Sequence, residues 1–463
     1  MMVKPDTDWA VVILLAGEGS RMNSDLPKVL HPVCGREMVR HVLDVIGEVH
    51  AGLVVAVVGP GAAVVRDTLG DLVEYVEQPD PRGTGHALLQ AEELLQGRAS
   101  NILVLYGDTP LLLPVTLAEI MERHQSEEAE VTMLTSRLAS PDGLGRVVRD
   151  DVSGRITEVV EERVADETQL AISEVNGGAY AFDARWLWPA LRKIALSEVK
   201  EYFLTNLVNL AAAAGAKVES VESREAAEVL GVNDRVQLSH AERAMRERIL
   251  RRWMLAGVTI VDPDVTYIQA GVTIGRDTTI HPNTTLNGAT TIGERCVLGP
   301  GAAVYDSVLG DDCTIGASML EGARLESRVI VGPFSHLRGG TVVEQGVFIG
   351  NYVEIKNSRL GRGTAMGHFS YVGDADVGEE VNIGAGAVTC NFDGVSKNRT
   401  IIEDGAFIGS DTMLVAPVRI GAGASTAAGS VVIKDVPPDS VAIGMPAHVR
   451  LKKKGSGRAA IGH

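Results

Sequence analysis

Residues 407–432 read FIGSDTMLVAPVRIGAGASTAAGSVV. Every sixth position of this stretch carries an aliphatic residue or threonine, namely Ile408, Leu414, Ile420, Thr426 and Val432. Glycine directly follows Ile408 and Ile420. A six-residue repeat of this kind is typical of a parallel β-helix, in which the repeated side chain points into a prism and small residues turn the chain.

The same period extends back toward residue 257. Two further runs follow it, made of Ile274, Ile280 and Leu286, and then Ile292, Leu298 and Val304. The segment from Thr389 to Ile401 interrupts the period, so we expect it to loop out of the coil. The period itself leaves the hand of the coil open.

The first half of the chain follows a different pattern. The apolar runs AVVILL (10–15), LVVAVV (53–58) and ILVLY (102–106) predict strands that are covered on both faces. Helical spacing marks residues 84–95 and 112–124. The alternation predicts a Rossmann-like α/β domain with a mostly parallel sheet, and ligands usually bind beyond the carboxyl ends of such strands.

Residues 233–255 predict one helix between the two halves. Asn233 or Asp234 can cap its start, and an apolar stripe is expected from Val236, Met245, Ile249 and Trp253. We therefore expect a first domain at 1–232, a linker helix at 233–256 and a β-helix domain at 257–463.

Composition narrows the class of protein. The chain has 463 residues, 45% of them hydrophobic and 22% charged, as in soluble globular proteins with two or three domains. A net charge of −17 argues against a nucleic-acid partner. The early apolar run from Trp9 to Ala16 is too short to span a bilayer and follows two aspartates, so we expect no membrane association and a cytoplasmic protein. The four cysteines lack zinc spacing and are expected to be free buried thiols: Cys34, Cys296, Cys313 and Cys390.

One loop suggests chemistry at phosphorus. Residues 14–30 read LLAGEGSRMNSDLPKVL and lack the full dinucleotide and P-loop fingerprints. Glycines let backbone N–H groups approach phosphate oxygens, while Arg21 and Lys28 offset charge that develops during displacement at phosphorus. Such chemistry needs a divalent metal, and Asp108 at the end of a predicted strand would offer a carboxylate to Mg²⁺. Taken alone, the Gly17-Glu18-Gly19 turn also fits a purely structural role.

The complete loop resembles the signature of sugar-1-phosphate nucleotidyltransferases. Further strings resemble the bacterial family of bifunctional N-acetylglucosamine-1-phosphate uridyltransferases and glucosamine-1-phosphate acetyltransferases, over nearly the whole chain. These strings include GTGHA (83–87), YGD (106–108), EVNGG (174–178), GVND (231–234), GNYVEIK (350–356), GHFSYVGDA (367–375) and VNIGAGAVTCNFDG (381–394). The resemblance implies a left-handed β-helix and a homotrimer that makes UDP-N-acetylglucosamine, a precursor of the cell wall and of lipopolysaccharide.

The resemblance also implies a role for individual residues of the first half. Lys28 would hold the nucleotide phosphates, Arg21 would assist the departure of pyrophosphate, and Asp108 and Asn233 would ligate Mg²⁺. The uridine nucleotide and sugar would contact Leu14, Leu15, Ala16, Gly17, Gln78, Gly83, Thr84, Tyr106, Gly107, Gly145, Glu161 and Asn176.

In the second half, the resemblance makes His368 the general base for acetyl transfer from acetyl-CoA, because a histidine near its ordinary pKa can take the proton of an amine. Glu354 would help to position this site. Glucosamine-1-phosphate would be bound by Arg338, Lys356, Tyr371 and Asn382, and acetyl-CoA by Ala385, Asn391, Phe392, Ser410 and Ala428. The segment 389–401 would reach a neighbouring subunit, so that the site is shared.

Some positions depart from the family pattern. Phe392 stands where tyrosine is common, Gly339 where proline is usual, and the segment 442–450 lacks the usual arginine, which Arg450 could replace. Leu15 and Glu18 also differ from the commonest residues of the phosphate loop. The tail LKKKGSGRAAIGH (451–463) reads as a solvated end.

Two other interpretations remain open on sequence alone. The chain could keep only the nucleotidyltransferase, acting on another sugar or nucleotide, with the β-helix as an oligomerisation or regulatory scaffold. It could also be a non-catalytic hexapeptide assembly protein that senses sugar nucleotides. Release of CoA from acetyl-CoA and glucosamine-1-phosphate would separate the first from the bifunctional enzyme, and release of pyrophosphate would exclude the second.

Overall fold

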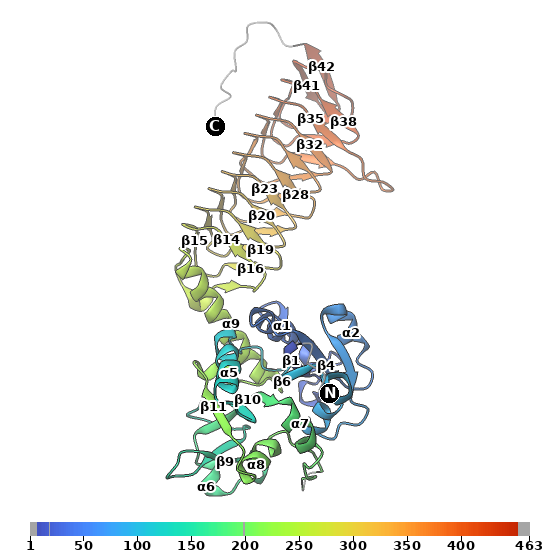
Figure 1. The fold of residues 1–463 in the computed structure, drawn as a ribbon. Helices are drawn as coiled ribbons and strands as arrows, with labels where there is room; N and C mark the ends of the chain where they lie inside the picture. The colour runs from blue at the N-terminus through green and yellow to red at the C-terminus, as the bar shows by residue number, and fades with distance from the viewer. Residues whose placement is uncertain (1–6, 18, 198–199, 452–463) are drawn as a thin grey trace. The chain divides into compact units, whose positions relative to one another are not determined.

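The computed structural model describes residues 7–17, 19–197 and 200–451. The chain divides into two compact units, Met1–Met245 and Arg246–His463, whose elements are drawn in Figure 1. The predicted tail falls outside the described residues apart from Leu451, as does Glu18. No helix among the described residues is long and apolar enough to cross a membrane.

The first unit is built around one twisted sheet. Its main path runs β11-β7-β10-β6-β1-β4-β5, and the β8–β9 hairpin pairs with β10. The strands of this path are β1 (Thr7–Leu14), β4 (Leu53–Val58), β5 (Glu74–Glu77), β6 (Ala99–Tyr106), β7 (Val131–Arg137), β10 (Glu174–Asp183) and β11 (Val218–Glu222). β1 lies parallel to β4 and β6, whereas β10 is antiparallel to β6 and β7. The predicted α/β sheet is confirmed, with one antiparallel strand inside it.

Helices and short strands complete this unit. The hairpin strands are β2 (Pro32–Val33), β3 (Arg36–Glu37), β8 (Arg146–Arg149) and β9 (Ile156–Val160). The helices are α1 (Met38–Glu48), α2 (Ala63–Leu69), α3 (Thr84–Leu89), α4 (Glu92–Leu95), α5 (Pro114–Ser126), α6 (Glu167–Leu170), α7 (Ala184–Leu191) and α8 (Asn206–Ala213). Short 3₁₀ turns are η1 (Ser20–Met22), η2 (Lys28–Leu30), η3 (Gly70–Leu72), η4 (Glu162–Val164) and η5 (Ala226–Val229).

Strand β1 shows why its sequence is apolar throughout. Val12 packs in a core cluster with Val104 and Leu187, while its neighbour Val11 packs in a second cluster with Leu103 on the other face. Successive side chains of a strand point to opposite faces, so burial on both sides needs a continuous apolar run.

The helix expected at 84–95 is wrong as one continuous element. It breaks into α3 and α4, because the N–H groups of Gln90 and Ala91 bond to carbonyls three residues back, those of Ala87 and Leu88. Three-residue bonding tightens the chain and ends a regular α-helix. The helix expected at 112–124 is α5, whose start is set by Pro114 at its first position.

Helix α9 (Arg235–Leu255) runs across the residues where the two units meet in sequence. Asp234 caps it, since its carboxylate accepts the N–H of Gln237 at 2.9 Å. Val236 is 64% exposed, so its predicted place in the apolar stripe is wrong. Leu238 and Ala241 pack instead with Val33 and Met38, because their side chains lie on the face of α9 that meets the first unit.

The second unit is a parallel β-helix of three long sheets (Figure 1). One sheet contains β12 (Thr259–Ile260), β15 (Thr279–Ile280), β18 (Val297–Leu298), β21 (Thr314–Ile315), β24 (Ile330–Val331), β27 (Phe348–Ile349), β30 (Ala365–Met366), β33 (Asn382–Ile383), β36 (Phe407–Ile408), β39 (Ser425–Thr426), β41 (Ser440–Gly444) and β42 (Ala447–Leu451). We call it the first face. A 3₁₀ turn, η6 (Pro263–Val265), follows β12.

The other two sheets run alongside it. The second face contains β13 (Tyr267–Ile268), β16 (Thr285–Asn287), β19 (Ala303–Tyr305), β22 (Met319–Glu321), β25 (His336–Leu337), β28 (Val353–Lys356), β31 (Ser370–Gly373), β34 (Val388–Cys390), β37 (Met413–Val415) and β40 (Val431–Val432). The third face contains β14 (Thr273–Ile274), β17 (Thr291–Ile292), β20 (Val308–Leu309), β23 (Arg324–Leu325), β26 (Val342–Val343), β29 (Arg359–Leu360), β32 (Ala375–Val377), β35 (Thr400–Ile402) and β38 (Val418–Ile420).

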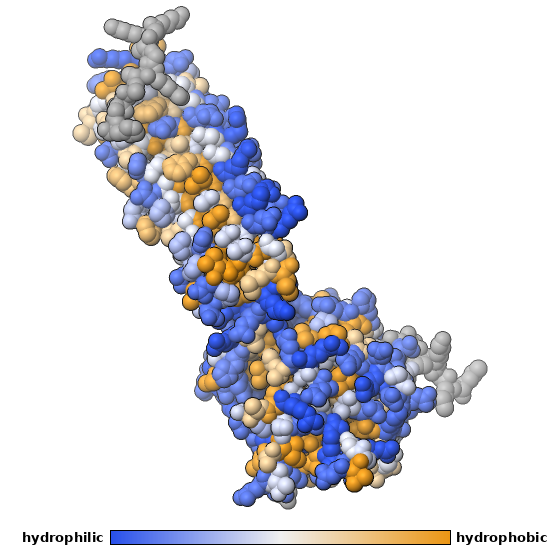
Figure 2. Space-filling view, turned by 90° about the vertical axis from the view of Figure 1, so that its left-hand side faces the viewer, coloured by the Kyte–Doolittle hydropathy of each residue, from blue (hydrophilic) through white to orange (hydrophobic). Residues whose placement is uncertain are grey.

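The repeated aliphatic residues stack inside the coil as predicted. Ile280, Leu298 and Ile315 lie in register on successive strands, and all three are fully buried. The residue before each of them points outward. Apolar side chains also reach the surface, where Figure 2 shows them in orange patches along the β-helix.

The predicted loop-out of 389–401 is confirmed in its central part. β34 ends at Cys390 and β35 begins at Thr400, and the residues between them leave the coil as a narrow hairpin (Figure 1). Phe392 and Lys397 form an antiparallel bridge within it. All four cysteines are free thiols; Cys390 is half-buried and the other three are buried.

Candidate active sites

A cavity of about 300 Å³ lies in the first unit where β1 and β6 end. Ten of the predicted nucleotide residues line it: Leu14, Leu15, Ala16, Gly17, Lys28, Gln78, Gly83, Thr84, Tyr106 and Asp108. Gly107 joins the two turns, because its N–H bonds to the carbonyl of Leu14 at 3.2 Å. Val29, Pro81, Ala87 and Glu201 complete the lining and were not expected from the sequence.

Three predicted residues meet beside this cavity. The Lys28 ammonium donates hydrogen bonds to the Asp108 carboxylate and, at 3.0 Å, to Oδ1 of Asn233. The Lys28 and Asp108 side chains are only 12% and 18% exposed, so water screens this ion pair less than a surface pair. Two oxygens from distant parts of the sequence therefore converge on one cation.

The backbone explains how Asn233 reaches this point. Val232 donates its N–H to the carbonyl of Asp108 at 2.9 Å, which fixes the segment against the end of β6. Because Asp234 caps α9, the side chain of Asn233 is free to turn toward Lys28. The sequence offered either Asn233 or Asp234 as the cap of this helix, and the structure shows that it is Asp234.

The phosphate loop approaches Lys28 closely at Gly19. Gly19 has φ +64°, and a Cβ there would lie 2.7 Å from Cβ of Lys28, so only glycine fits. Arg21 follows on η1, where it is exposed and makes no hydrogen bond or ion pair with a described residue. The structure therefore places Arg21 on the same loop as Lys28 but outside the cluster with Asp108 and Asn233.

The three predicted sugar residues also come together. The N–H of Asn176 bonds to the carbonyl of Gly145 at 2.9 Å, and Gly145 packs beside Val159 and Val160 just before Glu161. Burial raises the pKa of the Glu161 carboxyl, while a 2.8 Å hydrogen bond from the Thr205 hydroxyl opposes this shift. Burial also raises the pKa of the Tyr106 phenol, with a further contribution from nearby Glu161. Tyr106 thus links the sugar residues to the nucleotide cavity.

A segment that sequence reasoning missed covers this region. Tyr202 pairs with the loop before α3 through its backbone, donating to Arg82 and accepting from Gly85 at 2.8 Å each. Gly83, at φ +103°, has no room for a Cβ because the Tyr202 backbone lies 2.7 Å from that position. The Thr84 hydroxyl accepts the N–H of Leu204 at 3.0 Å. The segment 200–205 has no periodic pattern, so its place over the cavity could be found only from the structure.

A polar group lies on the second face of the β-helix. Arg338, just after β25, donates to Glu354 on β28 at 2.9 Å, and Glu354 is in register with Tyr371 on β31. Lys356 lies at the end of β28, and the nearby Lys397 ammonium lowers its pKa. Arg338, Lys356 and Lys397 concentrate positive charge beside the carboxylates of Glu354 and Asp374, and such a cluster of cations suits a phosphate group. Lys397 lies in the hairpin that breaks the period and was not among the predicted residues.

A second group stacks along one edge of the prism. His368, Ala385, Ser410 and Ala428 each come two residues after the inward residue of successive first-face strands, β30, β33, β36 and β39. The backbone links them, since Asp411 donates to the carbonyl of Ala385 at 2.6 Å and Gly429 to that of Ser410 at 2.8 Å. His368 is exposed, and the three residues that follow it in the stack have small side chains.

Asn382 and Phe392 lie apart from these groups in a single chain, whereas the Asn391 amide donates to the Tyr371 hydroxyl at 3.5 Å. Asn382 points outward on the first face between Ala365 and Phe407, whereas Tyr371 is on the second face. Phe392 is 61% exposed on the hairpin. Asn391 is buried beside it and donates to the Asp374 carboxylate at 2.6 Å.

The structure locates three of the positions that depart from the family pattern. Leu15 is buried and lines the nucleotide cavity, and Gly339 is exposed directly after Arg338. The segment 442–450 belongs to the antiparallel β41–β42 hairpin, in which Arg450 is exposed and pairs with Val441.

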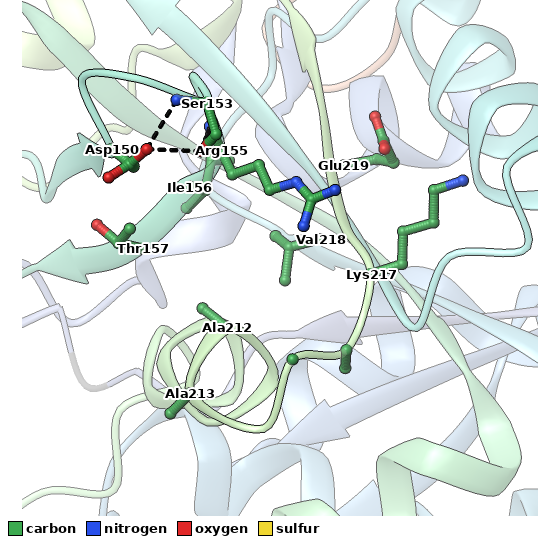
Figure 3. Close-up of a pocket in the computed structure, with 12 residues that line it drawn as sticks. Asp150, Ser153, Arg155, Ile156, Thr157, Ala212, Ala213, Lys217, Val218 and Glu219 are labelled. Carbon is green, nitrogen blue, oxygen red and sulfur yellow. Dashed lines mark hydrogen bonds between the residues drawn. The ribbon is translucent and has the colours of Figure 1, made fainter.

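A separate pocket of about 630 Å³ lies at the β8–β9 turn, α8 and the start of β11 (Figure 3). Asp150 turns back to accept hydrogen bonds from the backbone and hydroxyl of Ser153, and Arg155 extends into the space in front of β11. None of the predicted site residues lines it.

Comparison with known proteins agrees with this arrangement. A family model described as a MobA-like NTP transferase domain matches residues 11–192, and one described as the hexapeptide repeat of succinyl-transferase matches 289–317 and 399–434. The bifunctional protein GlmU of Halalkalibacterium halodurans is 45% identical over 433 residues, which cover 93% of this chain and 95% of that protein. The GlmU of Pelobacter propionicus is 44% identical over 96% of this chain and 99% of its own length. A crystal structure of UDP-glucose pyrophosphorylase complexed with UDP-glucose covers 52% of this chain at 14% identity and a TM-score of 0.45.

The identity to these relatives extends through both the α/β unit and the left-handed β-helix, and no large part of either protein is left out. The chain therefore belongs to the family of bifunctional GlmU proteins.

Proposed function

We propose that this chain makes UDP-N-acetylglucosamine in two steps. Residues 257–463 transfer an acetyl group from acetyl-CoA to glucosamine-1-phosphate, and residues 1–232 couple the product to UTP with release of pyrophosphate. Residues 233–256 link the two domains. The observation that carries the proposal is that one chain holds two separate polar groups, Lys28–Asp108–Asn233 in the first unit and Arg338–Glu354–Lys356 on the β-helix. The same β-helix carries His368.

In uridylyl transfer, a phosphate oxygen of N-acetylglucosamine-1-phosphate attacks the α-phosphorus of UTP and pyrophosphate leaves. Asp108 and Asn233 fit Mg²⁺, because their oxygens already converge on one cation and oxygen ligands suit this metal. When bound, Mg²⁺ supplies positive charge to the phosphates. Lys28 then turns from Asp108 to a phosphate oxygen, while Arg21 on η1 stabilises the departing pyrophosphate.

The sugar is held by the group next to Tyr106. Glu161 accepts from a sugar hydroxyl, with its carboxylate oriented by Thr205. The side chain of Asn176 and the backbone at Gly145 hydrogen-bond the N-acetyl portion. The cavity residues from Leu14 to Gly17, with Gln78, Gly83 and Thr84, enclose the uridine nucleotide.

In acetyl transfer, the amine of glucosamine-1-phosphate attacks the thioester carbonyl and CoA leaves as the thiol. His368 removes the amine proton. Arg338, Lys356 and Lys397 hold the phosphate, Tyr371 contacts the sugar, and Glu354 fixes the Arg338 guanidinium. Acetyl-CoA lies along the edge of Ala385, Ser410 and Ala428, with Asn391 and Phe392 beside it.

The β-helix surface supports a homotrimer. The parallel strands of the first face, from β12 to β41, carry no charged side chain at their outward register positions: Thr259, Thr279, Val297, Thr314, Ile330, Phe348, Ala365, Asn382, Phe407, Ser425 and Val441. The third face instead presents Arg324, Arg359, Asp376 and Arg419. Because interface cores are depleted in charge, we assign the first face to subunit contacts. Asn382 then reaches a site completed by a neighbouring subunit. All substrates are soluble small molecules, so we place the enzyme in the cytoplasm.

Two coupled assays test the proposal. The wild type should release CoA thiol from acetyl-CoA with glucosamine-1-phosphate, and pyrophosphate from UTP and N-acetylglucosamine-1-phosphate with Mg²⁺. His368→Ala should lose thiol release and keep pyrophosphate release. A folded wild type that forms pyrophosphate but releases no thiol would make the β-helix a scaffold, and failure of both reactions would overturn the proposal.

A further inference from the structure

Arg235 occupies an unfavourable place for a cation. It is the first residue of α9, where the partial positive charge of the helix dipole disfavours another positive charge. Its neighbour His31 is 4% exposed, so Arg235 also places charge beside a buried imidazole. Arginine at this position is therefore explained by its tertiary contacts rather than by local helix stability.

Those contacts lie on either side of the second half of the phosphate loop. Nε of Arg235 donates to the carbonyl of Met22 at 3.2 Å, and Nη1 lies 3.2 Å from Nδ1 of His31. Met22 ends η1 directly after Arg21, and His31 follows η2, which begins at Lys28. One guanidinium thus contacts the residue that follows Arg21 and a residue three positions after Lys28.

The same residue is tied to the metal ligand. Arg235 lies two residues after Asn233 in a segment fixed by the N–H of Val232 on Asp108 and by the cap at Asp234. The Asn233 N–H also donates to Oε1 of Gln237 at 2.7 Å. The planar fork of arginine can bond two acceptors in fixed directions, which a lysine cannot do.

We propose that Arg235 is a positioning residue for uridylyl transfer, which holds the loop of Arg21 and Lys28 in a fixed place relative to Asn233. The proposal rests on the proposed nucleotidyltransferase function. Arg235 does not contact the substrate. It fixes the positions of Arg21 and Lys28, the two cations proposed to bind phosphate. Errors near 1 Å in such groups can lower a rate by about a hundredfold.

The test uses the full chain and Arg235→Met, which keeps the aliphatic stem and removes the fork. The kcat for pyrophosphate release should fall about tenfold to a hundredfold, whereas the KM for N-acetylglucosamine-1-phosphate should change less than about twofold. Arg235→Lys should recover part of the loss, because one of the two acceptors can still be bonded. Arg224→Met is the matched control, since Arg224 is exposed in the same unit and its guanidinium pairs with Glu119 at 3.0 Å; it should keep wild-type kcat.

Two further readouts separate positioning from a general loss of structure. Thiol release by the β-helix and the thermal midpoint should stay at wild-type values in Arg235→Met. In an Arg21→Ala background, Arg235→Met should lower the kcat for pyrophosphate release by less than about a further threefold, because both residues act through one loop. Three results would overturn the proposal. Arg235→Met could keep the wild-type kcat for pyrophosphate release, or it could lose thiol release to the same extent. In the double variant, the losses of kcat from Arg235→Met and Arg21→Ala could multiply in full. A wild type without pyrophosphate release would instead refute the proposed function itself.

Discussion

The contact of Lys28 with Asp108 and Asn233 predicts competition between a lysine and a divalent metal. The Lys28 ammonium bonds to the two oxygens that would ligate Mg²⁺. A metal ion entering alone must break these bonds, whereas a nucleotide brings phosphates that give Lys28 other partners. Metal binding should therefore be weak without nucleotide and much stronger with it.

The perturbation is Lys28→Met, which retains the length of the side chain and removes its charge. A hydrogen bond to a charged group contributes about 1.5–3 kcal/mol, and these side chains are only 12% and 18% exposed. At about 1.4 kcal/mol per tenfold change, the variant should bind divalent metal about tenfold to a hundredfold more tightly without nucleotide. Its affinity for UTP should fall about tenfold, because a phosphate partner is lost.

The assay is a titration of the full chain with Mn²⁺ as a spin probe, with and without UTP. Lys193→Met, at an exposed lysine of the same unit, is the control and should match the wild type. If Lys28→Met bound Mn²⁺ no more tightly than the wild type in the absence of UTP, the competition would be refuted.

Three further outcomes are expected. Thr205→Val should raise the KM for N-acetylglucosamine-1-phosphate about fivefold, since one hydrogen bond to Glu161 is lost, and Thr205→Ser should restore it; equal kinetics in all three proteins would remove Thr205 from the sugar site. Lys397→Met should raise the KM for glucosamine-1-phosphate about tenfold in the thiol assay and leave pyrophosphate release unchanged, and an unchanged KM would show that the hairpin lysine does not contact the phosphate. Burial lowers the pKa of His124 to about 4 against an ordinary 6.5, so the unfolded chain takes up a proton first, and stability should fall by about 3 kcal/mol as pH drops from 6.5 to 4. Thermal unfolding of the first unit across this range should show a shallower slope in His124→Gln, where His31, His41 and His86 still contribute because burial lowers the pKa of each as well; a parallel slope in both proteins would contradict this reasoning.

The β-helix was predictable because its fold follows from local repetition. Each coil needs the same buried residue in the same place, so the period in residues 407–432 predicts both the stacking and the buried set. The loop-out around Asn391 was predictable for the same reason, since a break in the period must leave the coil. Lys397 was missed because the hairpin has no periodic pattern from which the position of its side chains relative to the β-helix could be predicted.

The α/β unit shows the limit of local reasoning more clearly. Apolar runs predicted its strands, but the split of 84–95 into α3 and α4 depends on two backbone bonds that no spacing reveals. Resemblance to a family supplied Lys28, Asp108 and Asn233 as separate roles. That the three meet at one point is a property of the folded chain.

The sequence by itself determined the two fold types, because period and composition act over neighbouring residues, and resemblance to a family supplied the phosphate loop and the candidate site residues. Only the tertiary structure decided that Asp234 caps α9 and leaves Asn233 free, that Thr205 holds Glu161, and that Arg235 ties Met22 and His31 to α9. These are contacts between segments more than 40 residues apart, apart from the cap. Their partners are chosen by how the sheet and helices pack, and spacing along the chain carries no record of that choice.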